Sequence, residues 1–417
     1  MKILQINKFF FLKGGSERHF FDLSELLLKK NHEVITWSTK HPKNFSFPNQ
    51  ELFANYNDFS EKNSILKKLF KAQRILWNQD AKKKLEKIIK QKKPDIAHLH
   101  NISTHFSPSI IFVLKKCKIP IILTLHDYKF FCPNYKFFSN NEVCFDCLKN
   151  KNYNSCISKK CIKNSWIQSL GGYLEGKWQK DFLKIQEKID IFLAPSLFIK
   201  RKAIEWGIPK EKVIYLPNFI DQDYKDEKQK NKKQDNYFLY FGRLSQEKGV
   251  EFLIKSFLKI SNRFPQFKLK IAGNGPEGKK IKDLIKGNQQ IELLGKKNSK
   301  ELKEIIANSY LTIIPSLWPE NFPYSVLESS ILAKPVLASK IGGLSEMIKH
   351  EKTGLLFKSN NQNDLEEKIL WAIKNLKKIK QMGELAQKEI LEKYNSEKYY
   401  DKLIKTYNII KKNHERK

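Results

Sequence analysis

The sequence predicts an α/β protein with two doubly wound domains of similar size. Apolar segments of strand length alternate with amphipathic helical patterns along nearly the whole chain, which favours parallel sheets with helices on both faces. The alternation stops once, at the charged segment DQDYKDEKQKNKKQDN (221–236), and then starts again. An exposed linker between two α/β domains explains this interruption. The length of 417 residues is sufficient for two domains with cores of their own.

Each predicted domain has its own series of strands. The first domain is expected over 1–217, the linker over 218–236, the second domain over 237–395, and a final helix returning to the first domain over 396–417. Strands are expected at 2–7, 33–38, 95–100, 119–125, 190–196 and 212–217, and then at 237–242, 267–273, 291–295, 310–316, 334–339 and 354–357. Helical patterns include 17–30, 65–92, 363–377, 380–393 and 397–412. Because ligands bind at the carboxyl ends of such strands, two facing domains would place a site in a central cleft.

Composition favours a globular protein in the cytoplasm. Hydrophobic residues make up 41% of the chain, and the longest apolar runs, such as IPIILTL (119–125), have the length of strands rather than of membrane spans. The N-terminal segment MKILQINKFFFLKGG is interrupted by polar residues and lacks a small-residue cleavage site, so it is interpreted as a first strand and not as a signal peptide.

The net charge of +34 comes almost entirely from lysine, since the chain has only six arginines. The lysines are spread over the helices, and nucleic-acid readers favour arginine and a local basic patch. The preferred interpretation is therefore a general lysine bias. Attraction to an anionic membrane face is the second interpretation, which would suit an enzyme with a membrane-bound acceptor. Nucleic-acid binding ranks third and is not expected.

Two glycine-containing turns open the second domain. FGRLSQEKG (241–249) follows a strand and contains Arg243 and Lys248. The planar guanidinium of Arg243 offers several hydrogen-bond donors and Lys248 offers a point charge, and together they suit a diphosphate. A surface charge pair is the alternative. In AGNGPE (272–277), Gly273 and Gly275 would let the backbone approach a ligand, although a plain turn between strand and helix gives the same pattern. Gly342 and Gly343 in IGGLSEMI precede another helix N-terminus, which favours anions.

The segment WPENFPYSVLESS (318–330) places Glu320 in a proline-flanked loop and Glu328 in a helix eight positions later. The helix is expected to begin near Tyr324 or Ser325, after Pro323, with its first amides facing a phosphate. A carboxylate at Glu328 could accept hydrogen bonds from a vicinal diol such as a ribose, and Glu320 could reach a second ring. Support of the helix N-terminus by Glu328, worth about 0.3–1 kcal/mol, is the alternative.

The first domain has two candidate features of its own. In FLKGGSERH (11–19), Gly14 and Gly15 leave room for a ligand, and Ser16 is the expected N-cap of the following helix. TLHDY (124–128) places His126 and Asp127 at a strand end, where a histidine could bind a sugar hydroxyl, although a structural role is the commoner one for such a pair. His100 and Asn101 are weaker suspects, and acceptor-side residues are expected in loops such as 41–64.

The ordered set of motifs resembles a known family. The glycine loop, HDY, GRLSQEKG, AGNGPE, PENFPYSVLE and the later GG motif occur in the order and spacing of the retaining glycosyltransferases of family 4, which have the GT-B fold of two Rossmann-like domains. The resemblance covers essentially the whole chain. Its most specific element is the pattern of two glutamates, Glu320 and Glu328, combined with Arg243 and Lys248.

The resemblance implies roles for these residues. Arg243 and Lys248 would hold the diphosphate of a UDP- or GDP-sugar, Glu328 the ribose, and Glu320 the transferred sugar. Further donor contacts would come from the backbone around Phe322, Pro323, Tyr324 and Ser325, from Gly275, and from Gly14 and Gly15 of the first domain. His126 would lie near the sugar and complete a catalytic set with Glu320, Arg243 and Lys248. The leaving phosphate would help to deprotonate a sugar or lipid-linked acceptor, and no catalytic metal or other cofactor is expected.

Four of the six cysteines cluster at 144–161, within a cysteine-containing segment, 132–161, that is expected to be an insertion in the first domain. Their spacing favours a structural zinc site in a segment that has few apolar residues. Reduced thiols without a metal are the alternative, since disulfides are uncommon in the cytoplasm. The four candidate ligands are Cys144, Cys147, Cys156 and Cys161.

Together these observations predict a cytoplasmic, retaining glycosyltransferase that uses a nucleotide sugar to build a cell-surface polysaccharide or glycolipid. A nucleotide-sugar epimerase of the same fold is the first alternative, and it would release an isomerised sugar without an acceptor. A non-catalytic protein that binds sugar nucleotides or nucleic acid is the second. The joint presence of Arg243, Lys248, Glu320 and Glu328 argues against that second alternative.

Overall fold

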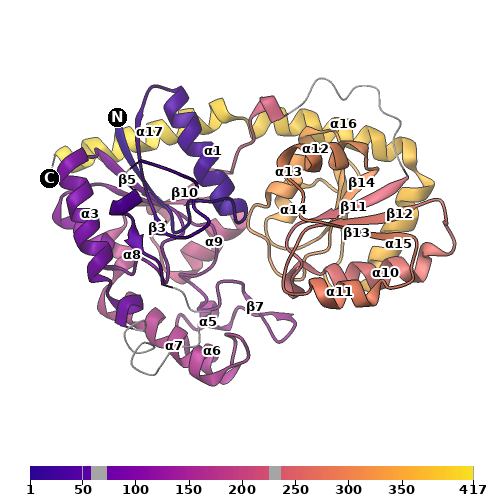
Figure 1. Cartoon of the computed structure of the whole chain (residues 1–417), viewed down its shortest axis with the longest axis horizontal. Coiled ribbons are helices and arrows are strands. Elements are labelled where there is room, and N and C mark those ends of the chain that lie inside the picture. The colour runs from indigo at the N-terminus through magenta and orange to yellow at the C-terminus, as the bar shows by residue number, and fades with distance from the viewer. Residues whose placement is uncertain (49, 58–72, 225–235, 417) are drawn as a thin grey trace. The chain divides into compact units, whose positions relative to one another are not determined.

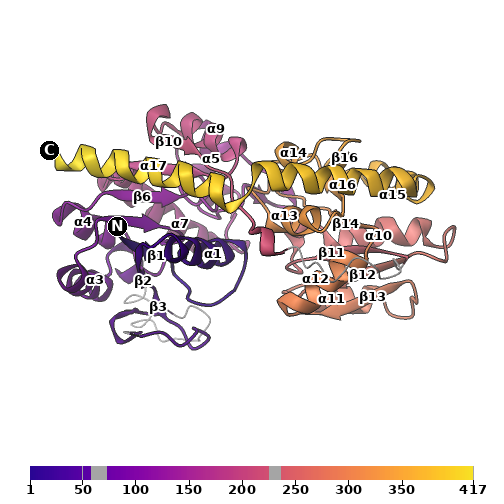
Figure 2. The ribbon, with the colours of Figure 1, turned by 90° about the horizontal axis from the view of Figure 1, so that it is seen from above.

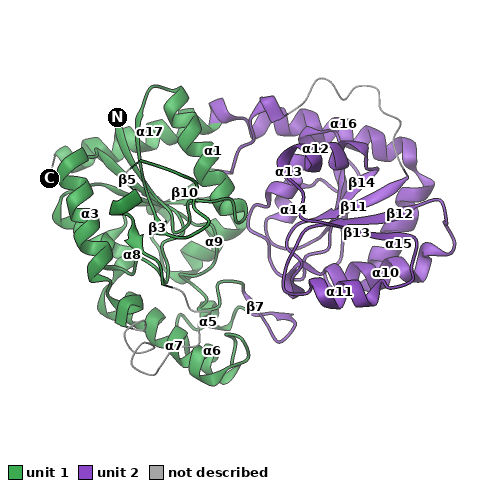
Figure 3. Ribbon diagram, viewed as in Figure 1, with its two compact units in different colours: residues 1–136, 145–216, 399–417 green, residues 137–144, 217–398 purple. Residues whose placement is uncertain are grey.

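The computed structural model describes residues 1–48, 50–57, 73–224 and 236–416. By its internal contacts the chain forms two compact units, shown in Figure 3. The first unit comprises 1–136, 145–216 and 399–417, and the second comprises 137–144 and 217–398. Each unit is built around a six-stranded parallel sheet, so the predicted α/β class with two doubly wound, Rossmann-like domains is confirmed.

The first unit has the strand order β10-β9-β6-β5-β1-β2, with all neighbours parallel. Since β1 lies between β2 and β5, the winding direction reverses between β1 and β5, and the carboxyl ends of these two strands flank the switch point. The strands are β1 (Lys2–Ile6), β2 (Glu33–Trp37), β5 (Ile96–Leu99), β6 (Ile121–Thr124), β9 (Ile191–Ala194) and β10 (Val213–Tyr215). The helices include α1 (Gly15–Lys29), α3 (Gln79–Lys92), α4 (Ser109–Lys116), α9 (Leu197–Trp206) and α17 (Ser396–Glu415).

The second unit has the order β13-β12-β11-β14-β15-β16, also parallel, and its switch point lies between β11 and β14. Its strands are β11 (Tyr237–Phe241), β12 (Lys268–Ala272), β13 (Ile291–Gly295), β14 (Leu311–Ile314), β15 (Val336–Ser339) and β16 (Gly354–Phe357). Its helices are α10 (Val250–Ser261), α11 (Gly278–Leu284), α12 (Ser299–Asn308), α13 (Tyr324–Ile331), α14 (Leu344–Met347), α15 (Gln362–Lys374) and α16 (Leu376–Lys393).

Alternation of side chains along β11 explains why this sheet is covered on both faces. All five residues of the strand are buried. Phe238 and Tyr240 belong to one apolar cluster, whereas Tyr237, Leu239 and Phe241 belong to another. Because successive side chains of a strand point to opposite faces, a continuous apolar run is what a sheet with two cores requires.

The C-terminal segment packs against the first unit, where α17 runs beside the strands in Figures 1 and 2. Lys411 Nζ lies 2.8 Å from Asp95 Oδ1, and His414 Nε2 lies 3.1 Å from Asp190 Oδ1. Tyr407 and Tyr399 on the same helix contact buried histidines of this unit. The helix α17 therefore completes the core of the first unit, which also contains β1.

Two expected segments differ in detail. The helix predicted over 65–92 is interrupted, since 73–76 are helical, 77–78 are not, and α3 begins at Gln79. The interruption lies at Asn78, the N-cap of α3, whose side chain accepts a hydrogen bond from the Ala81 amide; positions 65–72 lie outside the described residues. Of the predicted linker, 225–235 also lies outside them. The preceding residues are packed, since Ile220 and Tyr224 are buried in the core of the second unit.

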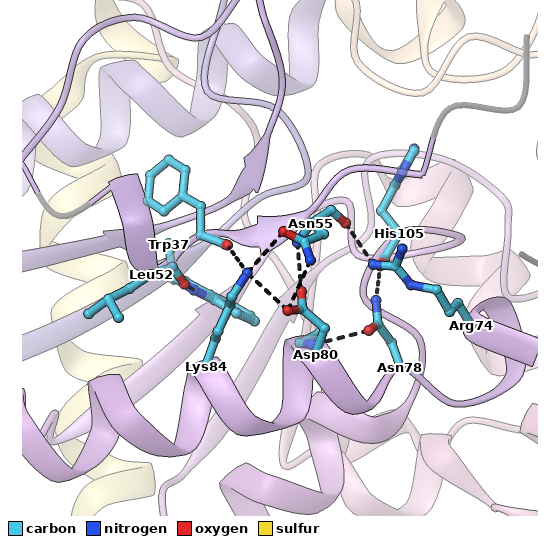
Figure 4. Close-up of polar contacts among 10 residues, drawn as sticks. Trp37, Leu52, Asn55, Arg74, Asn78, Asp80, Lys84 and His105 are labelled. Atoms are coloured by element: carbon cyan, nitrogen blue, oxygen red, sulfur yellow. Dashed lines mark hydrogen bonds and ion pairs between the residues drawn. The ribbon is translucent and has the colours of Figure 1, made fainter. Parts of the chain in front are cut away.

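Part of the loop region 41–64 is held against α3 by a polar network, shown in Figure 4. The Asp80 carboxylate accepts hydrogen bonds from the backbone and side-chain amides of Asn55 and pairs with Lys84. Lys84 also donates to the Phe53 carbonyl at 2.9 Å, and Arg74 donates to the Asn55 carbonyl at 3.1 Å. The chain around Asn55 is thus fixed by α3, whereas positions 58–64 lie outside the described residues.

Candidate functional site

The predicted motifs of the second unit meet at its topological switch point. The turn 242–249 follows β11, and the loop 315–323 follows the neighbouring strand β14. Both segments therefore leave the same edge of the sheet, where open α/β sheets bind their ligands. The backbone joins them directly, since the Leu317 amide donates to the Glu247 carbonyl at 2.9 Å.

Glu320 and Lys248 form the polar centre of this region. Lys248 Nζ lies 2.6 Å from Glu320 Oε1, and the Glu320 side chain is 5% exposed. The same oxygen accepts hydrogen bonds from Ser316 Oγ at 2.6 Å and Trp318 Nε1 at 2.8 Å. Within the described part of the chain, Oε2 makes no hydrogen bond. One carboxylate oxygen is therefore committed to holding the side chain in place, and the other is left for a ligand.

Close backbone packing fixes the loop that carries Glu320. The Gly343 amide donates to the Glu320 carbonyl at 2.7 Å. A Cβ atom at Gly342 would lie 2.4 Å from that carbonyl oxygen, and one at Gly343 would lie 1.7 Å from the Asn321 oxygen. The two glycines were interpreted from sequence as part of an anion site. In the structure their absence of side chains lets this backbone pack against the Glu320 loop, and the helix that follows them, α14, has only four residues.

Gly343→Ala is expected to lower the free energy of unfolding by about 1–3 kcal/mol, because the added methyl group overlaps a backbone carbonyl that cannot move freely. Gly278→Ala is the matched control in the same unit, since the nearest atom to its added Cβ is Leu244 Cδ1 at 4.0 Å. Urea denaturation of both variants measures the difference. Equal stability of the two variants would contradict the packing role given to Gly343.

Arg243 lies in an exposed turn beside this centre. Its backbone carbonyl accepts a hydrogen bond from Tyr240 Oη at 2.8 Å, which holds the turn. Its guanidinium makes no hydrogen bond or ion pair with any other residue that the structure describes. The Arg243 guanidinium is thus available to a ligand at the end of β11, whereas Lys248 is already paired with Glu320. Gly275 packs against the same turn, since its Cβ would lie 2.2 Å from the Leu244 oxygen.

The helix α13 begins at Tyr324, as predicted, with Pro323 as its N-cap and no capping side chain. Amides of its first turn, including that of Ser325, have no intrahelical partner and carry the positive end of the helix dipole. Glu328 lies in the second turn, is buried, and accepts a hydrogen bond from Tyr224 Oη at 3.2 Å. Phe322 has a structural contact, because its ring packs against Tyr394 at 5.3 Å.

At the switch point of the first unit, the glycine loop follows β1. Gly14 is the N-cap of α1 and Gly15 its first residue, with no side-chain cap. Ser16, the expected N-cap, lies inside the helix, so that prediction was wrong. The Glu17 carboxylate beside it is buried, and burial raises its pKa in spite of the opposing effect of Lys8. Glu17 was not singled out from sequence.

His126 belongs to a row of imidazoles at the ends of β5 and β6. His100 Nδ1 lies 2.9 Å from His126 Nε2, and His100 Nε2 lies 2.6 Å from Gln5 Oε1. With the Gln5 oxygen facing His100, His100 donates through Nε2 and accepts through Nδ1, so His126 donates through Nε2. Each ring then carries one proton. The suspected residue His100 is thereby the group that orients His126.

Two further histidines complete this cluster, defined here as His19, His98, His100 and His126. The rings of His98 and His100 stack with centroids 4.5 Å apart, and His19 lies 5.3 Å from His126. Burial lowers the pKa of His19 and His98 to about 3, and it holds the pKa values of His100 and His126 well below the ordinary value of 6.5. The cluster is therefore neutral at neutral pH. The strand pattern of DIAHLH (95–100) could have indicated that His98 belongs to this cluster, whereas nothing in the neighbouring sequence indicated His19.

A small hollow lies beside this row, lined by His100, His126, Asp127 and Lys129 among others. Burial raises the pKa of Asp127, partly offset by Lys8. Burial also acts against the charge of Lys129, but an ion pair with Glu175 at 2.8 Å outweighs it and raises the pKa of Lys129. This unit thus offers a hollow with a neutral histidine and a half-buried carboxyl group, both of which can hydrogen-bond to hydroxyl groups of a ligand.

The predicted residues therefore gather in two groups, one in each unit. The second unit matches the family of glycosyl transferases group 1 over residues 221–389, and residues 13–224, about half of the chain, match the family described as Glycosyltransferase Family 4. The chain belongs to glycosyltransferase family 4. The expected enzyme class is thereby confirmed.

Similar proteins support this membership. An uncharacterized glycosyltransferase of Methanocaldococcus jannaschii is 25% identical over 407 residues, which cover 95% of this chain and 94% of the relative. Another from the same organism is 32% identical over 220 residues, but the match spans only 59% of that relative and 52% of this chain. The crystal structure of Anabaena HepE with UDP and glucose superimposes with a TM-score of 0.67 at 16% identity, covering 98% of this chain and 99% of HepE. That likeness supports the GT-B fold.

Two of the four candidate zinc ligands of this family 4 chain lie next to each other. Cys156 and Cys161 lie with their sulfur atoms 2.6 Å apart, and the hydrogen bond between them raises the pKa of the Cys161 thiol. Cys147 is buried in the same unit, whereas Cys144 falls within the second unit. Among the described residues, no three metal-ligating side chains converge. The structural zinc site stays a prediction that metal analysis of the purified protein would test.

Proposed function

We propose that this protein transfers a sugar from a nucleoside diphosphate sugar to a hydroxyl group of an acceptor, with retention of anomeric configuration. The observation that carries the proposal is the fixed pair of Lys248 and Glu320 at the switch point of the second unit, with Arg243 exposed in the same turn as Lys248. Cations at the ends of strands suit a diphosphate, and the remaining Glu320 oxygen suits a sugar hydroxyl. The complex of HepE with UDP and glucose is a precedent in a protein of the same fold.

The donor would be held along α13. The amides at the start of this helix would bind phosphate oxygens, since they have no side-chain cap. Glu328, one turn further in, would accept hydrogen bonds from the ribose hydroxyls. The nucleoside is therefore expected over the second unit.

In the proposed reaction, the bond between the anomeric carbon and the diphosphate oxygen breaks, and a bond from the acceptor oxygen forms on the same face of the sugar. The acceptor proton passes to an oxygen of the leaving nucleoside diphosphate. Arg243 and Lys248 would stabilise the negative charge that develops on that group. His126, kept neutral and oriented by His100, would hold a sugar hydroxyl. Positioning and charge stabilisation then supply the catalysis without a protein nucleophile.

We further propose a cytoplasmic enzyme whose acceptor is a sugar or a lipid-linked sugar, used to build a cell-surface polysaccharide or glycolipid. The support is the resemblance in motifs and the large positive charge. Each helix in the described part of the chain is too short or too polar to be a membrane span.

The test is a thermal-unfolding and product screen of the wild-type protein with UDP-, GDP- and ADP-sugars. A donor present at 100 times its dissociation constant should stabilise the fold by about 2.7 kcal/mol. One nucleotide class should shift the unfolding midpoint and be consumed with release of the nucleoside diphosphate, and NMR of the product should show the donor's anomeric configuration. An isomerised sugar without transfer would instead indicate an epimerase. Stabilisation by none of the donors would refute the donor site.

A further inference from the structure

An exposed row of large apolar side chains marks one surface of the first unit. The helix α7 (Trp166–Lys177) continues directly into one turn of π-helix, η2 (Trp178–Phe182). Ile167 and Leu174 are separated by two helical turns and so share a face. We call Trp166, Ile167, Leu174 and Phe182 the α7 stripe, and their exposed fractions are 53%, 76%, 51% and 67%. A group of large apolar side chains so exposed on one helical segment is typical of an interaction surface.

The opposite face of α7 is firmly packed, so the orientation of the stripe is fixed. Glu175 is buried and pairs with Lys129 at 2.8 Å. A Cβ atom at Gly172 would lie 2.4 Å from Ile162, and one at Gly176 would lie 2.7 Å from the Tyr153 ring. The helix cannot rotate to bury its apolar stripe without losing these contacts. Because Lys129 also lines the hollow beside His126, the stripe belongs to the element that supports this site.

The charge around the stripe favours an anionic surface. Residues 159–188 contain seven lysines and three acidic residues, and one of those acids, Glu175, is already paired. Lys163, Lys177 and Lys184 are exposed. Protein interfaces are depleted in lysine, whereas a helix with aromatic and aliphatic residues on one face and lysines beside it is typical of the membrane interface. In Figure 1, α6 (Asn154–Ser158) and α7 lie at the lower edge of this unit, away from α17 along its top.

We propose that the α7 stripe docks the first unit on an anionic lipid bilayer, with its apolar side chains inserted at the interface and the neighbouring lysines on the headgroups. This inference extends the proposed function, in which the acceptor is lipid-linked, and its biological purpose rests on that proposed function. A hydroxyl on a lipid carrier would then meet the hollow beside His126 without leaving the bilayer. Vesicle binding needs neither donor nor acceptor, so a failure of docking is distinguishable from a failure of sugar transfer.

The experiment is co-sedimentation of the full chain with phosphatidylcholine vesicles, with and without phosphatidylglycerol, at physiological salt. The wild type should bind only the anionic vesicles. Leu174→Asp and Phe182→Asp should each weaken that binding at least tenfold. Leu385→Asp is the matched control, because Leu385 has the same 51% exposure as Leu174 but lies on α16 of the second unit. A second pair compares Lys177→Glu with Lys388→Glu, two exposed lysines on α7 and α16. Thermal unfolding and circular dichroism confirm that each variant is folded.

Three results would overturn the proposal. The wild type could fail to bind anionic vesicles. The stripe variants could bind as tightly as the Leu385→Asp control, which would assign the attraction to the dispersed lysines. Finally, sedimentation without lipid could show a dimer that Leu174→Asp dissociates, which would make the stripe a contact between two copies of this chain. In contrast, the membrane-docking proposal would be supported if Lys177→Glu bound anionic vesicles more weakly than Lys388→Glu.

Discussion

Arg243→Ala is expected to lower kcat/KM for transfer from the nucleotide sugar by about 10²- to 10³-fold while leaving the free energy of unfolding unchanged. The magnitude is that of removing a preorganised donor from a developing negative charge. Stability should not change, because the guanidinium is exposed and contacts no other described residue through a hydrogen bond or ion pair. Steady-state kinetics and urea denaturation of the same preparation measure the two quantities.

Lys248→Ala and Arg263→Ala provide the comparison. Lys248 is paired with the buried Glu320, so its removal should reduce activity and also cost about 1–3 kcal/mol of stability, since a buried carboxylate loses a partner. Arg263 is an exposed arginine elsewhere in the second unit, and its replacement should change neither quantity. Activity of Arg243→Ala equal to that of Arg263→Ala would remove Arg243 from the donor site. An unchanged stability of Lys248→Ala would contradict the structural role of the pair.

Lowering the pH from 7 to 5 is expected to destabilise the first unit by several kcal/mol. In the folded protein, burial holds the pKa values of His19, His98 and His100 well below 6.5, so the unfolded chain binds protons that the folded chain does not. The contribution of these groups to stability is therefore present above pH 6.5 and is lost as the pH falls. Each buried neutral imidazole accounts for about 2 kcal/mol between these two pH values.

The measurement is urea denaturation at pH 7 and pH 5 on the wild type, His19→Gln and Tyr399→Phe. His19→Gln removes one titrating group, so the difference between the two pH values should shrink by about 2 kcal/mol. Tyr399→Phe removes the hydroxyl that lies 3.1 Å from His19 Nε2 but keeps every imidazole. Its stability should fall at both pH values with the difference unchanged. If the free energy of unfolding of the wild type were the same at pH 7 and pH 5, the histidine cluster would not resist protonation.

Much of the fold follows from local patterns. Where short apolar runs alternate with amphipathic helices, such a run has few structures open to it other than a buried strand. Tyr237–Phe241 is fully apolar and forms the central strand of its sheet, as predicted. The start of α13 was predictable in the same way, since Pro323 limits where the helix can begin. The start of α3 at Gln79 was missed, because the pattern continues through its cap, Asn78.

The candidate site was predicted only in its components. The order of motifs indicated Arg243, Lys248, Glu320 and Glu328, but not that three donors would share one oxygen of Glu320. The glycine pair Gly342–Gly343 was visible, but its contact with the backbone of the Glu320 loop was not. Whether these glycines face a ligand or another backbone segment depends on which loop lies opposite, and that is decided by strand order.

The sequence by itself determined the α/β class, most strand positions and the motifs that end at the edges of the two sheets, because these depend on side chains a few positions apart. The tertiary structure decided the rest. It placed His98 against Tyr407, 309 positions later in the chain, and it set His19 beside His126. It also buried these imidazoles together, which makes them neutral. Proximity and desolvation are properties of the packed chain, and no local pattern contains them.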